Sequence, residues 1–340
     1  MDDPLLSVRG LTVQFTSGGR VSRALDGVDL EIRAGETVGL VGETGCGKSA
    51  TALAVMGLIP SPPGRVVAGQ VFFEREDLLT KTGAELRRLR GAGISMIFQE
   101  PMTSLDPSFT IGSQLAEVLE AHRGLAGRAG RQAALALLED VRLPHPERVL
   151  GQYPFQLSGG MRQRVMIALA TASQPRLLLA DEPTTALDVT TQAQILALLT
   201  RLNKEHKMGM LLVSHDFGVI AQVCDRVAVM YGGYIVETAP VEAIYHGAEH
   251  PYTRGLLESI PRIESAGHPT RLPLIRGLPP DPTEPPPGCV FEPRCPYTKP
   301  TCSAISMTLE PVGPAHATAC PVRPFAPASD EQATGAGAQA

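Results

Sequence analysis

Gly42-Glu43-Thr44-Gly45-Cys46-Gly47-Lys48-Ser49 is the stretch around which the rest of this chain is organised. It fits the pattern G-x-x-x-x-G-K-[ST] of a phosphate-binding loop. The apolar residues 37–41 before it predict a short buried strand, and residues 50–58 after it predict a helix that Pro60 stops. This strand–loop–helix context favours a nucleotide site over the alternative, a glycine-rich turn with a chance Lys-Ser pair.

Each residue type in the loop suits the binding of a nucleotide. Glycines let backbone N–H groups turn inward around phosphate oxygens, and the N-terminus of the following helix adds a partial positive charge. Lys48 can reach the β- and γ-phosphates, and the Ser49 hydroxyl can coordinate Mg²⁺. The predicted nucleotide-binding residues of the loop are Gly42, Glu43, Thr44, Gly45, Cys46, Gly47, Lys48, Ser49 and Ala50.

Length and composition exclude several classes of protein. The 340 residues suggest roughly two domains, and the net charge of −5 argues against non-specific nucleic-acid binding, which requires a basic face. There is no run of about 18 apolar residues to span a membrane, and the acidic start at residues 1–4 lacks the apolar core of a signal peptide. We expect a cytosolic protein whose six cysteines are thiols or metal ligands rather than disulfides.

The hydrophobic pattern predicts an α/β fold. Strands are predicted at residues 6–15, 28–32, 66–73, 94–98, 177–180 and 210–213, with a hairpin at 227–230 and 234–237. Helices are predicted at residues 84–90, 114–121, 131–141 and 190–206, and a helical run ends at residue 172. Residues 112–150 carry little strand signal, so we expect a helical insertion between two strands of the main sheet.

Two adjacent carboxylates follow the predicted strand at residues 177–180. In a site that holds ATP, Asp181 would bind Mg²⁺ through water, and Glu182 would polarise the water that attacks the nucleotide. The alternative is an acidic turn after a core strand. Two carboxylates at a strand end, downstream of a phosphate-binding loop, favour the catalytic interpretation.

A third motif, Leu157-Ser158-Gly159-Gly160-Met161, begins 24 residues before Asp181. It resembles the LSGGQ sequence of the ABC-transporter ATPases, with Met161 in place of the commoner Gln. Ser158 can cap a helix whose N-terminus points at an anion. The resemblance implies an α/β ABC cassette of the P-loop NTPases, with a mixed core sheet, an N-terminal antiparallel part and a helical subdomain. It also implies that Ser158, Gly159 and Gly160 serve the ATP bound on an opposite subunit.

The remaining motifs of that family occur in order. Gln99 matches the glutamine that contacts Mg²⁺ and the attacking water, and residues 100–105 after it should face the membrane subunit. Asp188 matches a loop at the dimer interface, His215 matches the histidine that contacts the γ-phosphate, and Phe15 matches the aromatic that stacks on adenine. The resemblance therefore implies catalytic roles for Glu182, His215 and Gln99, and Mg²⁺ coordination by Ser49, Gln99 and Asp181.

Two C-terminal motifs indicate which group of ABC-transporter ATPases this chain resembles. Residues 249–254 (EHPYTR) and 289–296 (CVFEPRCP) resemble the extension of the dipeptide/oligopeptide importer ATPases, of which nickel importers are close relatives. The resemblance implies a peripheral subunit at the cytoplasmic face of the inner or plasma membrane that powers peptide import. The implied partners are a second homologous ATPase subunit in a heterodimer, two transmembrane permeases and an extracytoplasmic peptide-binding protein, with no nucleic acid.

Four cysteines lie within 32 residues near the C-terminus, namely Cys289, Cys295, Cys302 and Cys320. A segment this small cannot bury enough surface to fold alone, and a metal can supply the difference. A [4Fe–4S] cluster, zinc and plain thiols are the three possibilities, although the spacings lack the close C-x₂₋₄-C pair usual for zinc. The resemblance favours the cluster, in a structural role, so a Cys295→Ser change should leave ATP binding intact. Cys46 and Cys224 are interpreted as structural.

Composition divides the chain into four parts. We predict a nucleotide-binding domain at residues 1–260 with its helical subdomain at about 112–172, a proline-rich linker at 261–288, a cysteine-rich module at 289–322 and a disordered tail at 323–340. Two alternatives to transport are a soluble ABC ATPase acting on ribosomes or DNA, and a metal-binding regulator that binds ATP without turnover. A soluble ABC ATPase usually has two cassettes or coiled-coil arms, whereas this chain has one cassette and no such arm. The intact Lys48, Glu182 and His215 argue against a regulator that binds ATP without turnover.

Overall fold

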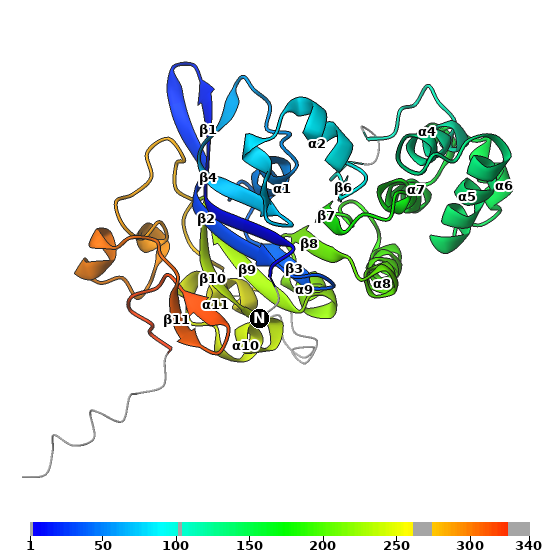
Figure 1. The fold of residues 1–340 in the computed structure, drawn as a ribbon. Coiled ribbons are helices and arrows are strands. Elements are labelled where there is room, and N and C mark those ends of the chain that lie inside the picture. The colour runs from blue at the N-terminus through cyan, green and yellow to red at the C-terminus, as the bar shows by residue number, and fades with distance from the viewer. Residues whose placement is uncertain (1–2, 101–103, 261–273, 326–340) are drawn as a thin grey trace, which may run out of the picture.

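The computed structural model describes residues 3–100, 104–260 and 274–325. Two β-sheets form the centre of the molecule, a group of helices lies at one end, and the C-terminal segment lies near the other (Figure 1). The predicted α/β class, with a mixed core sheet, an antiparallel N-terminal part and a helical subdomain, is confirmed. Part of the predicted linker (261–273) and most of the predicted tail (326–340) lie outside the described residues.

The core sheet has the strand order β11-β12-β10-β9-β3-β8-β7-β6. Strands β9 to β6 in that order are parallel, and β10, β12 and β11 extend the sheet by antiparallel pairing. Every residue of β3, β7 and β8 is buried, as expected of parallel strands that are covered on both faces. The strands are β3 Thr37–Val41, β6 Ile94–Ile97, β7 Leu177–Asp181, β8 Gly209–Ser214, β9 Arg226–Tyr231, β10 Tyr234–Pro240, β11 Glu310–Gly313 and β12 His316–Thr318.

The second sheet is antiparallel, with the order β2-β1-β4-β5. Its strands are β1 Leu6–Ser17, β2 Arg20–Ile32, β4 Gly64–Phe73 and β5 Glu76–Asp77. Strand β2 begins at Arg20, whereas the sequence predicts a start at residue 28. The first residues of β2 are mostly exposed and lack a regular alternation of apolar and polar side chains, so the sequence gives no strand signal there. They form a strand because their backbone pairs with β1 as far as the Ser17–Arg20 pair.

Four helices, α4 to α7, form the predicted insertion between β6 and β7 (Figure 1). Helix α4 is longer than predicted because Thr110 caps its N-terminus and Gly124 ends it in a left-handed conformation. The helices are α1 Lys48–Val55, α2 Gly83–Leu89, α4 Ile111–Arg123, α5 Gly127–Asp140, α6 Pro146–Leu150, α7 Gly159–Thr171, α8 Val189–His206, α9 Phe217–Val223, α10 Val241–Gly247 and α11 Pro251–Glu258.

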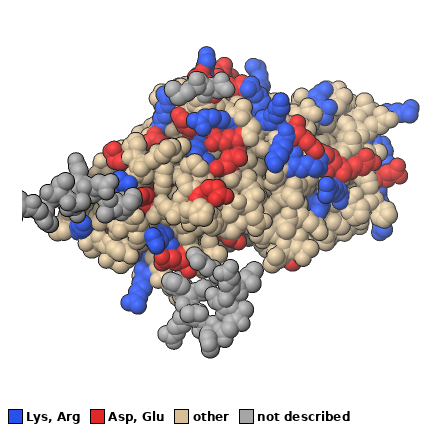
Figure 2. Space-filling model, turned by 90° about the horizontal axis from the view of Figure 1, so that it is seen from below, with Lys and Arg blue, Asp and Glu red and all other residues tan. Residues whose placement is uncertain are grey.

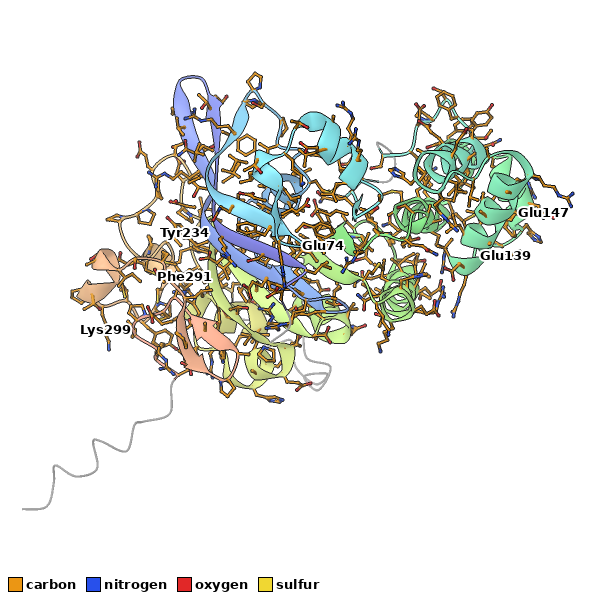
Figure 3. All side chains as sticks on the ribbon, in the orientation of Figure 1. Glu74, Glu139, Glu147, Tyr234, Phe291 and Lys299 are labelled. Atoms are coloured by element: carbon orange, nitrogen blue, oxygen red, sulfur yellow. The ribbon has the colours of Figure 1, made fainter. Side chains whose placement is uncertain are left out.

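The C-terminal segment shares its core with the large domain. Strand β12 pairs with β10 and thereby joins the central sheet. Val290 and Phe291 are buried in the main hydrophobic core beside residues of β9 and α11. Figure 3 shows Phe291 close to the central sheets, while Glu139 and Glu147 lie on the outer helices at the opposite end of the molecule. The burial that this short segment needs therefore comes in part from the large domain.

Charge is mixed on the face of the molecule that Figure 2 shows. Figure 2 shows basic and acidic side chains interspersed, with no continuous band of one sign on that face. Such a face has no extended positive field that would attract a polyanion. Within the ranges that the structure describes, no helix is long and apolar enough to cross a bilayer.

Candidate nucleotide site

The predicted phosphate-binding loop connects strand β3 to helix α1, as its sequence requires. Gly45 and Gly47 have φ angles of 84° and 114°, which favour glycine. A Cβ atom on Gly42 would lie 2.1 Å from the carbonyl oxygen of Met230, and one on Gly47 would lie 2.6 Å from that of Ala24. The glycines are thus required both for the turn and for its close approach to neighbouring backbone.

Lys48, the first residue of helix α1, is buried and folds back over the loop. Its Nζ atom donates to the carbonyl oxygens of Gly42 at 2.7 Å and Glu43 at 3.0 Å. The ammonium group is thereby held on the concave side of the loop, where a phosphate could replace the carbonyl contacts. This position agrees with the role predicted for Lys48, which stays a prediction.

An oxygen pair suited to Mg²⁺ lies between helix α1 and strand β7. The Ser49 hydroxyl donates to Oδ1 of Asp181 at 3.1 Å. Burial raises the pKa of Asp181, the hydrogen bond from Ser49 opposes this, and the neighbouring Glu182 carboxylate raises it further. A divalent cation would offset the cost of a buried carboxylate, so the donor set fits Mg²⁺ bound with ATP.

Three predicted catalytic residues meet at the carboxyl ends of adjacent parallel strands. Gln99 follows β6, Glu182 follows β7 and His215 follows β8. Oε2 of Glu182 accepts hydrogen bonds from Gln99 Nε2 at 3.1 Å and from Thr185 Oγ1 at 2.8 Å, and it lies 3.3 Å from Nδ1 of His215. A cavity of about 240 Å³ opens beside Glu182 and His215. The structure therefore brings together a carboxylate, an amide and an imidazole next to the Ser49–Asp181 pair.

The other predicted residues lie apart from this cluster. Ser158 caps helix α7 by accepting a hydrogen bond from the backbone N–H of Met161, and Gly159 and Gly160 form the first turn of that helix. Asp188 caps helix α8 through Thr191. Both caps are exposed, so these helix N-termini are open to a ligand or a second subunit.

Phe15 lies near the end of β1 and is half-buried. Its ring packs over the backbone of Gly64, where a Cβ atom would approach the ring to 2.7 Å. The assignment of Phe15 to adenine stacking stays a prediction.

Tyr252 and Arg294, which lie in the two C-terminal motifs, contact the phosphate-binding loop directly. Arg294 forms a bidentate ion pair with Glu43, with Nη1–Oε2 at 2.8 Å and Nη2–Oε1 at 3.1 Å. The backbone N–H of Glu43 donates to the Tyr252 hydroxyl at 2.9 Å. The tyrosine and the arginine each fall within one of the C-terminal motifs, but no local pattern links either motif to a loop more than 200 residues earlier.

The four C-terminal cysteines are free thiols that influence one another. The pKa of Cys289 is raised to about 11, mainly by burial and to a smaller extent by the charges of the other three thiols. Burial also raises the pKa of Cys295 and of Cys320. Hydrogen bonds from backbone N–H groups act in the opposite direction and lower the pKa of each of these three thiols. The donor is Phe291 for Cys289 and Tyr297 for Cys295, and residues 322 and 323 donate to Cys320. The backbone N–H of Lys299 lies 3.5 Å from the sulfur of Cys302.

Backbone N–H groups of this kind stabilise thiolates that are bound to a metal, so the chemistry of the four cysteines fits a metal centre. In the described part of the chain, however, no three metal-ligating side chains are grouped closely enough to hold an ion as they stand. The thiols of Cys46 and Cys224 lie elsewhere, and burial raises the pKa of each, which agrees with a structural role.

Comparison with known proteins agrees with these observations. Residues 25–185 match the family described as ABC transporter, and residues 236–302 match the family described as oligopeptide/dipeptide transporter, C-terminal region. The chain is 46% identical over 303 residues to the dipeptide transport ATP-binding protein DppD of Bacillus subtilis, covering 89% of this chain and 90% of the relative. It is 49% identical over 293 residues to the oligopeptide transport ATP-binding protein OppD of the same organism, covering 86% and 82%.

Similarity also extends to solved structures. The dimeric structure of MJ0796, a bacterial ABC transporter cassette, superimposes with a TM-score of 0.63 at 31% identity, covering 69% of this chain and 98% of that cassette. A dimeric post-hydrolysis state of MJ0796 bound to ADP and Pi gives the same TM-score at 30% identity. A cassette of similar fold, MJ0796, thus has a solved structure in which it is dimeric and bound to ADP and Pi.

Proposed function

This chain belongs to the ATP-binding subunits of the oligopeptide/dipeptide ABC transporters, and we propose that it powers the import of small peptides across the inner or plasma membrane. Its enzymatic activity is the hydrolysis of ATP coupled to transport. The observation that best supports peptide import driven by ATP is the contact of Gln99 and His215 with Glu182, beside the Ser49–Asp181 pair. The same chain also carries the oligopeptide/dipeptide C-terminal region.

Each residue in the cluster has a distinct proposed role. Lys48 and the loop N–H groups bind the phosphates, while Ser49 and Asp181 hold Mg²⁺, which neutralises phosphate charge when it is bound. Glu182 polarises the attacking water, and Gln99 and His215 hold that water and the γ-phosphate in place. The hydrogen bond from Gln99 and the contact with His215 keep the Glu182 carboxylate oriented toward this position.

The exposed N-terminus of helix α7 supports an ATP site shared between two subunits. Because Ser158, Gly159 and Gly160 form the exposed N-terminus of a helix that does not follow this chain's own phosphate-binding loop, we propose that they face the nucleotide of a second, homologous ATPase subunit. Closure of the two subunits on ATP would then complete each site. A single chain would bind ATP but lack the groups that complete the site.

We therefore expect low ATPase activity from the isolated chain and a large rise when the partner ATPase and the permeases are added. The measurement is the rate of phosphate release against protein concentration, with the Lys48→Ala chain in the same assembly as the control for contaminating activity. Full activity from a monomer, independent of concentration, would contradict the shared site.

Exposed aromatic residues on the helical subdomain support docking to the permeases. Phe109 and Phe155 are 56% and 60% exposed, and the ring of Tyr153 stacks on Phe155 with 5.5 Å between centroids. The two loops that carry them are joined by a hydrogen bond from Ile111 N–H to Gln152 O at 2.9 Å. We propose that this patch receives the membrane subunit. Of the predicted contact segment 100–105, residues 101–103 lie outside the described ranges.

We also propose that Cys289, Cys295, Cys302 and Cys320 hold a metal centre, first a [4Fe–4S] cluster and alternatively zinc. Raised thiol pKa values and the backbone N–H groups that donate to these sulfurs support this, because a metal would stabilise the thiolates that burial disfavours. The proposed role of the centre is to link the C-terminal segment covalently at four points.

Anaerobically purified protein is expected to be brown, with broad absorbance near 400 nm (roughly, for Cys-ligated clusters) and about four irons per chain. Cys295→Ser should bleach this absorbance and lower the melting temperature, and Cys224→Ser serves as the matched control. Elemental analysis distinguishes the metals. Stoichiometric zinc without iron would contradict the cluster, and absence of both metals would contradict the metal centre altogether.

The proposed partners and location follow from the family. We propose two transmembrane permeases and an extracytoplasmic peptide-binding protein, with this subunit at the cytoplasmic face of the membrane. A nickel importer of the same wider group is the second candidate function, since nickel importers are close relatives of the peptide importers. Transport assays with the reconstituted complex would distinguish peptides from Ni²⁺.

A further inference from the structure

One residue of the phosphate-binding loop, Glu43, is held by the C-terminal segment. Its carboxylate accepts two hydrogen bonds from the Arg294 guanidinium, in the planar geometry that suits an arginine–carboxylate pair. The side chain of Arg294 is only 5% exposed, so water and salt screen the pair weakly. The contact joins the loop to a segment 251 residues later in the chain.

The backbone of Glu43 is held as well. Its N–H donates to the Tyr252 hydroxyl at 2.9 Å, and its carbonyl oxygen accepts from Lys48 Nζ at 3.0 Å. Tyr252 is fully buried, and its ring centroid lies 4.5 Å from that of Tyr231 and 5.4 Å from that of Phe291. The hydroxyl that receives the Glu43 N–H is therefore fixed by aromatic packing.

Arg294 is fixed by contacts of its own. It donates to the backbone carbonyls of Arg276 at 3.0 Å and Ile275 at 3.3 Å, and to the Tyr231 hydroxyl at 3.2 Å. The guanidinium fork thus reaches four different groups at once, which a lysine could not do. Burial disfavours the charge of Arg294, but the hydrogen bonds to Glu43 and Tyr231 outweigh it and raise its pKa.

We propose that Arg294 and Tyr252 are positioning residues for nucleotide binding, through which the C-terminal segment holds the phosphate-binding loop in its receptive conformation. The inference deepens the proposed function, because it rests on ATP binding at this loop, but it does not depend on which substrate is transported. Two physical effects act together. Pre-organisation lowers the cost of ordering the loop on binding, and the guanidinium neutralises a carboxylate in a loop that must receive anionic phosphates.

The same short segment carries part of the proposed metal centre. Arg294 directly precedes Cys295, and Phe291 lies two residues after Cys289. Loss of a metal from these cysteines would loosen the segment that holds Glu43.

The test is the affinity of the anaerobically purified full chain for Mg·ATP, measured by fluorescence of a labelled ATP analogue. Arg294→Gln should weaken binding roughly tenfold or more, because it leaves Glu43 charged and unpaired. The double variant Glu43→Gln/Arg294→Gln should bind better than Arg294→Gln alone, because the unpaired charge is gone. Tyr252→Phe, which leaves the Glu43 N–H without its acceptor, should weaken binding about fivefold.

The matched control is Arg254→Gln, since Arg254 lies in the same C-terminal region but pairs with Glu258 and not with the loop. Melting temperatures without nucleotide separate lost folding from lost positioning. Wild-type affinity in Arg294→Gln and Tyr252→Phe, even with lowered melting temperatures, would overturn the proposal. If Arg294→Gln fails to fold, Tyr252→Phe decides the outcome. Because peptide is absent from this assay, a negative result would leave the transport function untouched.

Discussion

Glu182→Gln is expected to leave ATP binding intact while lowering the rate of hydrolysis by roughly 10² to 10⁴. The substitution keeps the shape of the side chain and removes the charge that we propose polarises the attacking water. Gln99 and Thr185 can still contact the amide, so the local structure should survive. Since ATP would remain bound, the closed dimer should accumulate, which size-exclusion chromatography of the ATP-loaded subunits would detect.

The matched control for this change is Glu242→Gln on helix α10, whose carboxylate is 89% exposed and contacts His246 of the same helix. It should hydrolyse ATP at the wild-type rate. If Glu182→Gln also hydrolyses ATP at that rate, Glu182 is not the residue that activates water.

Lys48→Ala is expected to lower the affinity for Mg·ATP by roughly tenfold to a hundredfold, the range for loss of a charge-assisted hydrogen bond. The change removes the ammonium that we propose contacts the phosphates. It also removes the hydrogen bonds to Gly42 and Glu43, which hold the two sides of the loop together. The measurement is equilibrium binding of a labelled ATP analogue to the full chain.

Two further variants define what Lys48 contributes. Lys48→Arg keeps the charge but places a larger, planar group in a buried position, so it should restore little affinity. Lys204→Ala, on the exposed face of helix α8, is the control and should bind as the wild type does. Unchanged affinity in Lys48→Ala would mean that the loop does not bind the phosphates through this residue.

Much of the proposed catalytic cluster could be predicted from sequence because it is built from residues at strand ends. Parallel strands of one sheet share an edge at their carboxyl ends, so polar residues that follow buried runs converge there. Gln99, Glu182 and His215 each follow such a run, and the structure brings them together. The phosphate-binding loop was predictable because its glycines satisfy local backbone requirements that any chain must meet.

The remaining features depend on contacts between distant segments. The pairing of β12 with β10 has no local hydrophobic pattern, because β12 is short and acquires its burial from the existing sheet. The ion pair of Arg294 with Glu43 likewise depends on how the C-terminal segment crosses the large domain. A charged residue in each motif was visible in the sequence, but nothing there indicated that the two were partners.

The most direct test of the central claim is coupled transport by the complete complex in proteoliposomes. The permeases, this subunit, its partner ATPase and the peptide-binding protein are reconstituted, and ATP hydrolysis and uptake of a labelled dipeptide are measured together. Peptide-loaded binding protein should stimulate hydrolysis and uptake, Ni²⁺ should stimulate neither, and Glu182→Gln in this chain should abolish both. Two results would contradict peptide import powered by this subunit. One is ATP hydrolysis that is stimulated by Ni²⁺ but not by peptide, and the other is peptide uptake at the wild-type rate in the Glu182→Gln complex.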